Sequence, residues 1–267
     1  MKYKKIDTKL FIKNRKNFVN KLERKSISFF NSNDIYPISA DSTLPFDQHR
    51  DIFYLSGIDQ EESLLVLFPD SVNLKYKEML FLRETNEYIT HWEGEKLTKE
   101  LAKDISGISN IFWLSEFDNI LKEILSQADF VYVNTNEHYR QNVQTQTRED
   151  RFINRLKKIG GIKFKKSNPI LQRQRSIKDE IEIELIKNAC EITKKGFERV
   201  LNFIKPGVWE YEIEAEFSHE FLRNRSRRFA YTPIIASGRN SNFLHYVYNN
   251  KQCLDGEIVL MDVAAEY

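Results

Sequence analysis

The stretch Glu257-Ile-Val-Leu-Met-Asp262-Val-Ala-Ala-Glu-Tyr267 ends the chain and decides the fold expected for its C-terminal part. The four apolar residues 258–261 predict a strand buried on both faces, because neither alternating face carries a polar side chain. Asp262 continues the face of Ile258 and Leu260, and a buried carboxylate needs a hydrogen-bonding partner or a metal ion. We therefore expect a metal ligand at Asp262, in a chain that is the front part of a metalloenzyme cut just after its first ligand.

A second candidate residue, His245, lies shortly before that strand. Residues 243–248 predict an aromatic strand around it, and Asp255-Gly256 is typical of a β-hairpin turn. If the two strands pair in the right register, His245 and Asp262 point into one cavity, which Tyr231 on an adjoining strand would line. A histidine in an aromatic strand is, taken alone, more often a core residue than a catalytic one. The nearby Asp262 is what favours a site here.

The first half of the chain predicts an α/β layer domain with a mixed sheet, because apolar strands alternate with short amphipathic helices. Gly160-Gly161 and Ser167-Asn168-Pro169 break this pattern, so we expect one domain over residues 1–165 and another over 166–267. The five lysines of 157–166 could form a nucleic-acid patch, but a solvated linker is favoured because the chain has no global excess of basic residues. The expected helices cover about 8–23, 99–105, 116–128 and 151–159, and the expected strands cover 26–30, 63–68, 78–82, 110–114 and 130–134.

The second half predicts an α+β domain with an unfinished sheet. Residues 176–179 resemble a capping box, and apolar residues at helical spacing from Ile181 to Val200 predict a long helix. A second helix is expected over Glu210–Arg223, with its glutamates facing mostly outward. Strands at 231–236 and 243–248 would then form an antiparallel meander with the terminal strand.

The composition indicates an ordinary globular protein, since 41% of residues are hydrophobic and 30% are charged. A net charge of +2 is too small to recruit nucleic acid or anionic lipid. No apolar run is long enough to span a membrane, and the N-terminus lacks the apolar segment of a secretory signal. Two cysteines, Cys190 and Cys253, show no metal-site spacing and are expected to be reduced thiols in a cytoplasmic protein.

Several short motifs follow one another along the chain. Residues 50–57 read Arg-Asp-Ile-Phe-Tyr-Leu-Ser-Gly, residues 231–238 read Tyr-Thr-Pro-Ile-Ile-Ala-Ser-Gly, and Leu244-His245-Tyr246 precedes the terminal strand. In this order, and together with Arg175-Ser-Ile-Lys-Asp-Glu180 and Pro206-Gly207, they resemble the aminopeptidase P family. The resemblance covers nearly the whole chain.

The resemblance implies a creatinase-type α/β amino-terminal domain followed by the first part of an α+β pita-bread catalytic domain. Members of this family bind two divalent metal ions, usually manganese, and cleave the peptide bond before a penultimate proline. By position, Asp262 matches the first metal-ligating aspartate, and His245 matches a histidine that lines the substrate pocket and takes part in catalysis. Tyr231 matches a tyrosine beside it, and Trp92 resembles a substrate-binding tryptophan that reaches a neighbouring subunit's active site.

Two departures from the family pattern matter. Ala264 stands where the family commonly has glycine, which often marks a close backbone approach in a strand. The family's other four metal ligands would lie beyond Tyr267, and one carboxylate cannot satisfy a hard divalent ion that takes about six ligands. We therefore expect the fragment itself to be inactive, although its parent protein is active.

The resemblance implies that the parent is a cytoplasmic, manganese-dependent Xaa-Pro aminopeptidase. Its partners would be peptides with a penultimate proline and further copies of itself in a homo-oligomer, with no nucleic acid and no membrane. Two alternatives remain open. One is a prolidase, which cuts Xaa-Pro dipeptides, and the other is a non-catalytic pita-bread module that binds a protein.

Overall fold

The computed structural model describes residues 3–138 and 144–267, which form two compact units. The first unit spans Ile6–Ile177, and the second spans Lys178–Tyr267 together with residues 3–5. No helix within the described ranges combines the length and the apolar character needed to cross a bilayer.

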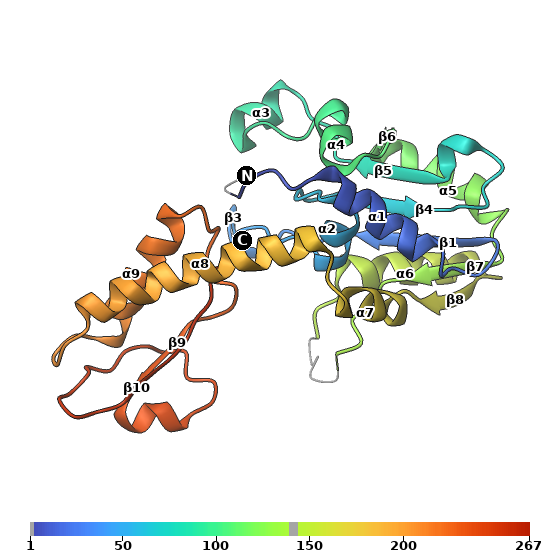
Figure 1. Cartoon of the computed structure of the whole chain (residues 1–267). Coiled ribbons are helices and arrows are strands. Elements are labelled where there is room, and N and C mark those ends of the chain that lie inside the picture. The colour runs from blue at the N-terminus through green and yellow to red at the C-terminus, as the bar shows by residue number, and fades with distance from the viewer. Residues whose placement is uncertain (1–2, 139–143) are drawn as a thin grey trace. The chain divides into compact units, whose positions relative to one another are not determined.

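The first unit is built on a mixed six-stranded sheet (Figure 1). Its strands are β1 (Ser26–Asn31), β4 (Leu64–Leu67), β5 (Glu78–Leu82), β6 (Asn110–Trp113), β7 (Phe130–Val133) and β8 (Lys163–Lys166). They lie in the order β6-β5-β4-β1-β7-β8, and β1 pairs antiparallel with β4 and parallel with β7. The mixed α/β character expected from the sequence is confirmed. A short hairpin of β2 (Pro37–Ser39) and β3 (Ser42–Thr43) stands apart from this sheet.

Helices cover both faces of the sheet. The elements packed on one face are α1 (Thr8–Val19), α2 (Arg50–Ser56), α4 (Lys99–Ser106) and α7 (Asn168–Ser176). The elements packed on the other face are α5 (Phe117–Leu125) and α6 (Arg148–Ile159). The short helix α3 (Glu87–Glu93) and the 3₁₀ turns η1 (Leu74–Tyr76) and η2 (Leu114–Glu116) complete the unit.

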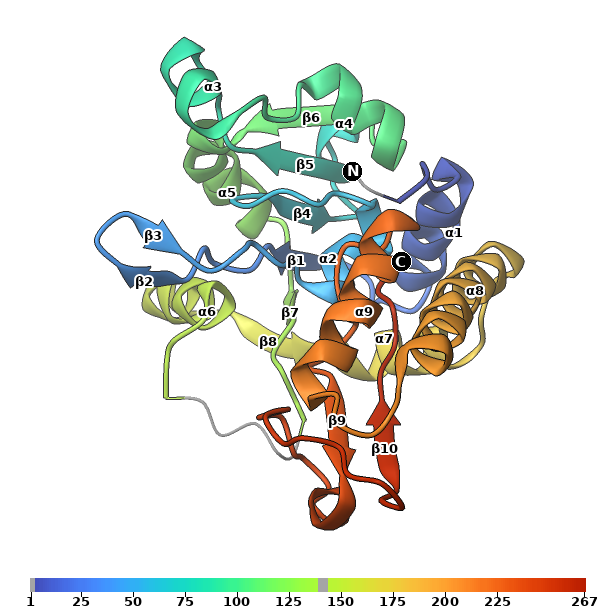
Figure 2. The same cartoon turned by 90° about the vertical axis from the view of Figure 1, so that its left-hand side faces the viewer.

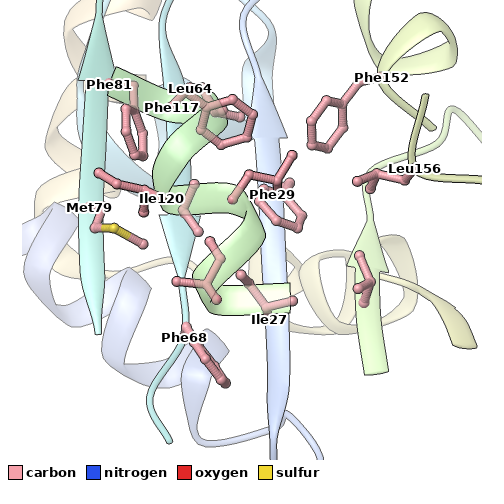
Figure 3. Packing of buried hydrophobic residues seen from close by; sticks show 14 of the residues in the cluster. Ile27, Phe29, Leu64, Phe68, Met79, Phe81, Phe117, Ile120, Phe152 and Leu156 are labelled. Carbon is pink, nitrogen blue, oxygen red and sulfur yellow. The ribbon is translucent and has the colours of Figure 1, made fainter. Parts of the chain in front are cut away.

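Alternation along the strands gives each face its own hydrophobic core. On β1, Ile27 and Phe29 point to the face covered by α5 and α6, where Phe29 lies 6.3 Å from Phe117 between ring centroids (Figure 3). Phe30 points to the opposite face and packs edge-on against Phe18 of α1, at 5.2 Å. Every residue of β1 is therefore buried, as in a strand covered on both sides.

The lysine-rich residues 157–166 form the edge of the sheet, so the linker interpretation is wrong. They comprise the end of α6 and the strand β8, which pairs in parallel with β7. Phe164 packs against the core, whereas Lys165 forms an ion pair with Glu23 and lies 4.3 Å from the centre of the Phe130 ring. Phe164 alternates with lysines along β8, so this strand has one apolar side chain facing the core. Because the lysines dominate its composition, the sequence suggests a solvent-exposed segment.

Helix α7 also belongs to the first unit, which therefore extends past the boundary expected at residue 165. Leu171 is almost fully buried in the core beneath α1, α2 and α4. Arg175 forms an ion pair with Asp51 at the start of α2, with 2.6 Å between Nη1 and Oδ1. Both contacts fasten α7 to the sheet.

The second unit contains two helices and a two-stranded antiparallel ribbon. Its elements are α8 (Glu180–Phe203), α9 (Glu210–Arg223), β9 (Ile234–Ser237), the 3₁₀ turn η3 (Gly238–Asn242) and β10 (Val259–Asp262). Figure 2 shows β9 and β10 side by side. In their antiparallel register Asp262 pairs with Ile234. The start of α8 is a true capping box, but it is made by Asp179 and Glu182, because Ser176 ends α7 instead.

Helices α8 and α9 come into close contact at Gly196. A Cβ atom at this position would lie 2.6 Å from Cε1 of Phe221 and 2.8 Å from Cδ1 of Phe217, which is closer than packed carbon atoms approach. Both rings are fully buried in the core of this unit. Packing therefore requires glycine at residue 196. The backbone there has an ordinary helical conformation and would itself accept residues other than glycine.

Candidate functional site

The structure joins two of the residues predicted to form the site, Tyr231 and Asp262. Asp262 is the last residue of β10, and Tyr231 lies three residues before β9. The hydroxyl of Tyr231 donates a hydrogen bond to Oδ1 of Asp262 over 2.6 Å. Partial desolvation, this hydrogen bond and the charge of Asp262 together raise the pKa of Tyr231 to about 12. At neutral pH the phenol of Tyr231 therefore keeps its proton and donates it in this hydrogen bond.

Strand β10 is covered on one face only, which corrects the expectation that both faces are buried. Val259 and Met261 pack towards α8 and α9. Leu260 is 40% exposed on the alternate face, and Asp262 is exposed beside it. The apolar run 258–261 wrongly predicted burial of both strand faces. In the described residues, helices lie against only one face of the ribbon.

His245 does not lie on a strand. Residues 243–248 form a turn and extended loop, and β10 pairs with β9 instead. The loop nevertheless lies on the Asp262 side of the ribbon, because Tyr246 packs against Ile234, the cross-strand neighbour of Asp262. The imidazole of His245 is exposed. Within the described residues, no hydrogen bond or ion pair joins it to Asp262, so a shared cavity stays a prediction.

A buried carboxylate that the sequence did not single out, Glu210, holds this loop. Oε1 of Glu210 accepts hydrogen bonds from the backbone N and the hydroxyl of Ser237, at 2.6 and 2.7 Å. Oε2 accepts from the hydroxyl of Tyr246 at 2.7 Å and from the backbone N of Lys251 at 2.9 Å. Burial alone would raise the pKa of Glu210, but these four hydrogen bonds outweigh it and lower the pKa. The expectation that Glu210 faces outward is wrong.

A second glutamate of α9, Glu214, contacts the same loop one helical turn later. Its Oε2 accepts a hydrogen bond from Nδ2 of Asn249 over 2.8 Å. The side chain of Asn249 also donates to the carbonyl of Pro233 and accepts from the backbone N of Ile235. Asn249 is 2% exposed and has a φ of +45°, a conformation that asparagine tolerates better than most residues.

Sequence reasoning missed Glu210 because its partners are far away in the chain. Ser237, Tyr246 and Lys251 lie between 27 and 41 residues further on. The local signal is that of an ordinary acidic first turn, which helix dipoles favour on any exposed helix.

Trp92, the remaining predicted site residue, lies on α3 in the first unit and is 71% exposed. Its ring neighbours are Tyr88 and His91 on the same helix. The helix is fastened by Glu93, whose two carboxylate oxygens each lie 2.9 Å from a guanidinium nitrogen of Arg83. Trp92 is thus an exposed side chain on a helix that is bound to Arg83 through Glu93.

The described residues do not form a metal centre by themselves. Across residues 3–138 and 144–267, no three His, Cys, Asp or Glu side chains come close enough to share a metal ion. Asp262 offers hard oxygen ligands of the kind that manganese and magnesium prefer, but it belongs to no such group of three among the described residues. A two-metal centre therefore does not fit the described residues alone.

Comparisons with known proteins match both units. Residues 184–267 match the family model of metallopeptidase family M24, and residues 11–132 match that of the aminopeptidase P N-terminal domain. The chain is 29% identical to the Xaa-Pro aminopeptidase of Escherichia coli over 86% of its own length and 52% of that protein. It is 30% identical to the Xaa-Pro aminopeptidase of Haemophilus influenzae, over 85% and 50% of the two lengths.

A solved structure agrees with these matches. Zinc-substituted E. coli aminopeptidase P in complex with product superimposes with a TM-score of 0.84 at 27% identity, covering 99% of this chain and 60% of that one. The second unit is thus the start of an M24 pita-bread domain, of the metallopeptidase class. The two family matches, the relatives and the solved structure together support aminopeptidase P as the family of this chain. It spans about half the length of the curated relatives it matches.

Proposed function

We propose that the protein translated from the complete reading frame is a metal-dependent Xaa-Pro aminopeptidase, which releases the N-terminal residue before a penultimate proline. The observation that carries this function is the match of residues 184–267 to metallopeptidase family M24, with Asp262 at the end of β10 and bound by Tyr231. The match of the first unit to the aminopeptidase P N-terminal domain supports the aminopeptidase P type within that class.

In this function Asp262 supplies one carboxylate to a divalent metal centre, and manganese is the metal implied by the family resemblance. The hard oxygen ligands of a carboxylate suit manganese. A zinc-substituted form of E. coli aminopeptidase P supports a divalent ion in general. His245 and Tyr231 then belong to the substrate pocket, where His245 binds the peptide and takes part in its cleavage.

The proposed enzyme is a cytoplasmic homo-oligomer. The exposed position of Trp92 on the fastened helix α3 supports a role in which it reaches the substrate of a neighbouring subunit. The cytoplasmic location is supported by the two cysteines, Cys190 exposed and Cys253 buried, which are both free.

The test uses the protein from the complete reading frame, stripped of metal and then supplied with manganese. Release of the first residue is measured on an Xaa-Pro tripeptide and on an Xaa-Pro dipeptide. We expect cleavage of the tripeptide, and a loss of at least about a hundredfold in Asp262→Ala, since a ligand matters more than the groups that orient it. The matched control is Asp255→Ala in the exposed turn before β10, which should retain full activity.

Cleavage of the dipeptide alone would identify a prolidase instead. Absence of cleavage on both peptides would leave the non-catalytic binding module as the function. Activity that survives Asp262→Ala would remove Asp262 from the metal centre.

A further inference from the structure

The loop that carries His245 has few apolar anchors of its own. Phe243 is 54% exposed, Leu244 is 90% exposed and Tyr248 is 79% exposed. Between residues 243 and 250, only the side chains of Tyr246 and Asn249 are buried. A loop with so little buried apolar surface is not held by the hydrophobic effect, so its conformation must come from specific bonds.

Those two buried side chains are the ones bound by the glutamates of α9. Tyr246 donates to Glu210, and Asn249 donates to Glu214. Residues four apart on a helix lie on the same face, about 6 Å apart along the axis, so the two carboxylates form one continuous acidic edge. The loop is attached to this edge at two points, and His245 is the residue directly before the first of them.

Burying the carboxylate of Glu210 costs free energy of folding, and packing alone does not explain its presence. A carboxylate without solvent contact must have its desolvation offset by hydrogen bonds, and an apolar residue at the same place would often give equal or greater stability. The four donors to Glu210 come from the end of β9, from Tyr246 and from Lys251. One side chain therefore links the end of the sheet to both sides of the loop.

We infer that Glu210 and Glu214 are positioning residues, which hold residues 243–251 in one conformation and so fix where His245 stands on the Asp262 side of the ribbon. The contribution to substrate binding rests on the proposed function, whereas the fixing of the loop does not.

The first test measures hydrogen exchange of backbone amides in the full chain. Tyr246→Phe removes the hydrogen bond to Glu210, and with it the contacts of the same hydroxyl with the side chain and backbone N of Asn250, while leaving the charge of Glu210 and its bonds to Ser237 in place. Glu214→Ala removes only the bond to Asn249 and is therefore the cleaner variant. In both variants, amides of residues 244–251 should exchange about tenfold faster than in the wild-type chain, as expected for the loss of buried hydrogen bonds that oppose a local opening.

Two control variants accompany this test. Glu214→Gln keeps an oxygen that can accept from Asn249 and should restore slow exchange. Glu216→Gln alters a glutamate of the same helix that pairs with Arg199 and has no hydrogen bond to the loop among the described residues. It should leave residues 244–251 unchanged. Wild-type exchange in Tyr246→Phe and Glu214→Ala would overturn the inference, and so would faster exchange spread evenly over Lys178–Tyr267.

The second test links the loop to the substrate in the protein from the complete reading frame. Tyr246→Phe should raise KM for the tripeptide severalfold more than it lowers kcat, and this effect should vanish in a His245→Ala background, because both changes act through one side chain. An effect of Tyr246→Phe that persists without His245 would refute positioning of that residue. If the wild-type enzyme cleaves no peptide, the proposed function fails, while the exchange experiment still decides whether the glutamates fix the loop.

Discussion

The hydroxyl oxygen of Tyr231 lies 2.6 Å from Oδ1 of Asp262, so a hydrogen bond joins the segment that leads into β9 to the last residue of β10. This bond fixes the orientation of a carboxylate that is otherwise exposed. The bond is made to one of the two carboxylate oxygens, Oδ1. The carboxylate is therefore presented in one orientation before any further group approaches it.

Asp262→Asn should lower the pKa of Tyr231 from about 12 towards the ordinary value of a tyrosine. The negative charge that resists ionisation of the phenol is removed, while the partial desolvation remains and the neutral amide oxygen accepts only a weaker hydrogen bond from the hydroxyl. The Cζ resonance of Tyr231 in ¹³C NMR, assigned by comparison with Tyr231→Phe, follows this titration directly. An unchanged midpoint in Asp262→Asn would mean that the pair does not form in solution.

Glu210 should make the second unit sensitive to acid. Its pKa in the folded protein is lowered, so its contribution to stability is fully present above the pKa of an unfolded glutamate and is lost as the pH falls through the lowered folded value. Urea unfolding of the full chain should show the free energy of unfolding of this unit falling with pH below about 4.

The comparison variant for that acid effect is Glu210→Gln. It should be less stable than the wild-type chain at neutral pH, because its single amide oxygen can replace only one of the two carboxylate oxygens and the donors to the other, either those of Ser237 or those of Tyr246 and Lys251, lose their acceptor. Its deficit should shrink in acid, where the wild-type carboxylate also becomes protonated. Equal slopes with pH for the two proteins would contradict the assignment.

Gly196→Ala should destabilise the second unit although alanine favours helix. The gain in helix propensity is about 1 kcal/mol, and overpacking of a well-filled core costs roughly 1–3 kcal/mol. The steric cost lies at the upper end here, since both Phe217 and Phe221 are fully buried and cannot swing away. Thermal unfolding measures the difference, with the exposed α8 substitution Asn188→Ala as a control that should be neutral or stabilising.

A fragment covering residues 1–177 should fold alone and melt at a higher temperature than one covering residues 1–165. The longer fragment retains α7, with Leu171 buried and Arg175 paired to Asp51. Burial of one leucine contributes about 2 kcal/mol, which corresponds to roughly 5 °C or more in Tm for a unit of this size. Equal melting curves would show that α7 adds nothing to the first unit.

Much of the fold could be predicted from the sequence, because its elements are strongly periodic. The helices α8 and α9 and the strands β1, β5 and β7 appear close to where apolar spacing indicates them. The aromatic residues 243–248 were wrongly expected to form a strand, because a run rich in aromatic residues is typical of strands. What makes them a loop is the positive φ of Asn249 and its bonds to Glu214 and Pro233, which involve residues distant in the chain.

The candidate site was predictable only in part for a similar reason. Asp262 ends strand β10, and Tyr231 lies three residues before β9, where the sequence predicts the strand to begin too early, yet a local pattern finds both residues. Glu210 carries no such pattern, since an acidic residue in a first helical turn is ordinary. Its importance arises from three segments that converge on it in space, and no local spacing expresses such a convergence.

Strand β8 ends the sheet with Lys163, Lys165 and Lys166 along its length. Another molecule that tried to add a strand here would have to strip water from these ammonium groups before its own backbone could bond. A lysine-rich edge strand of this kind opposes edge-to-edge association most when chains are concentrated and partly folded. The lysines therefore matter less for the stability of the folded unit than for preventing aggregation while it folds.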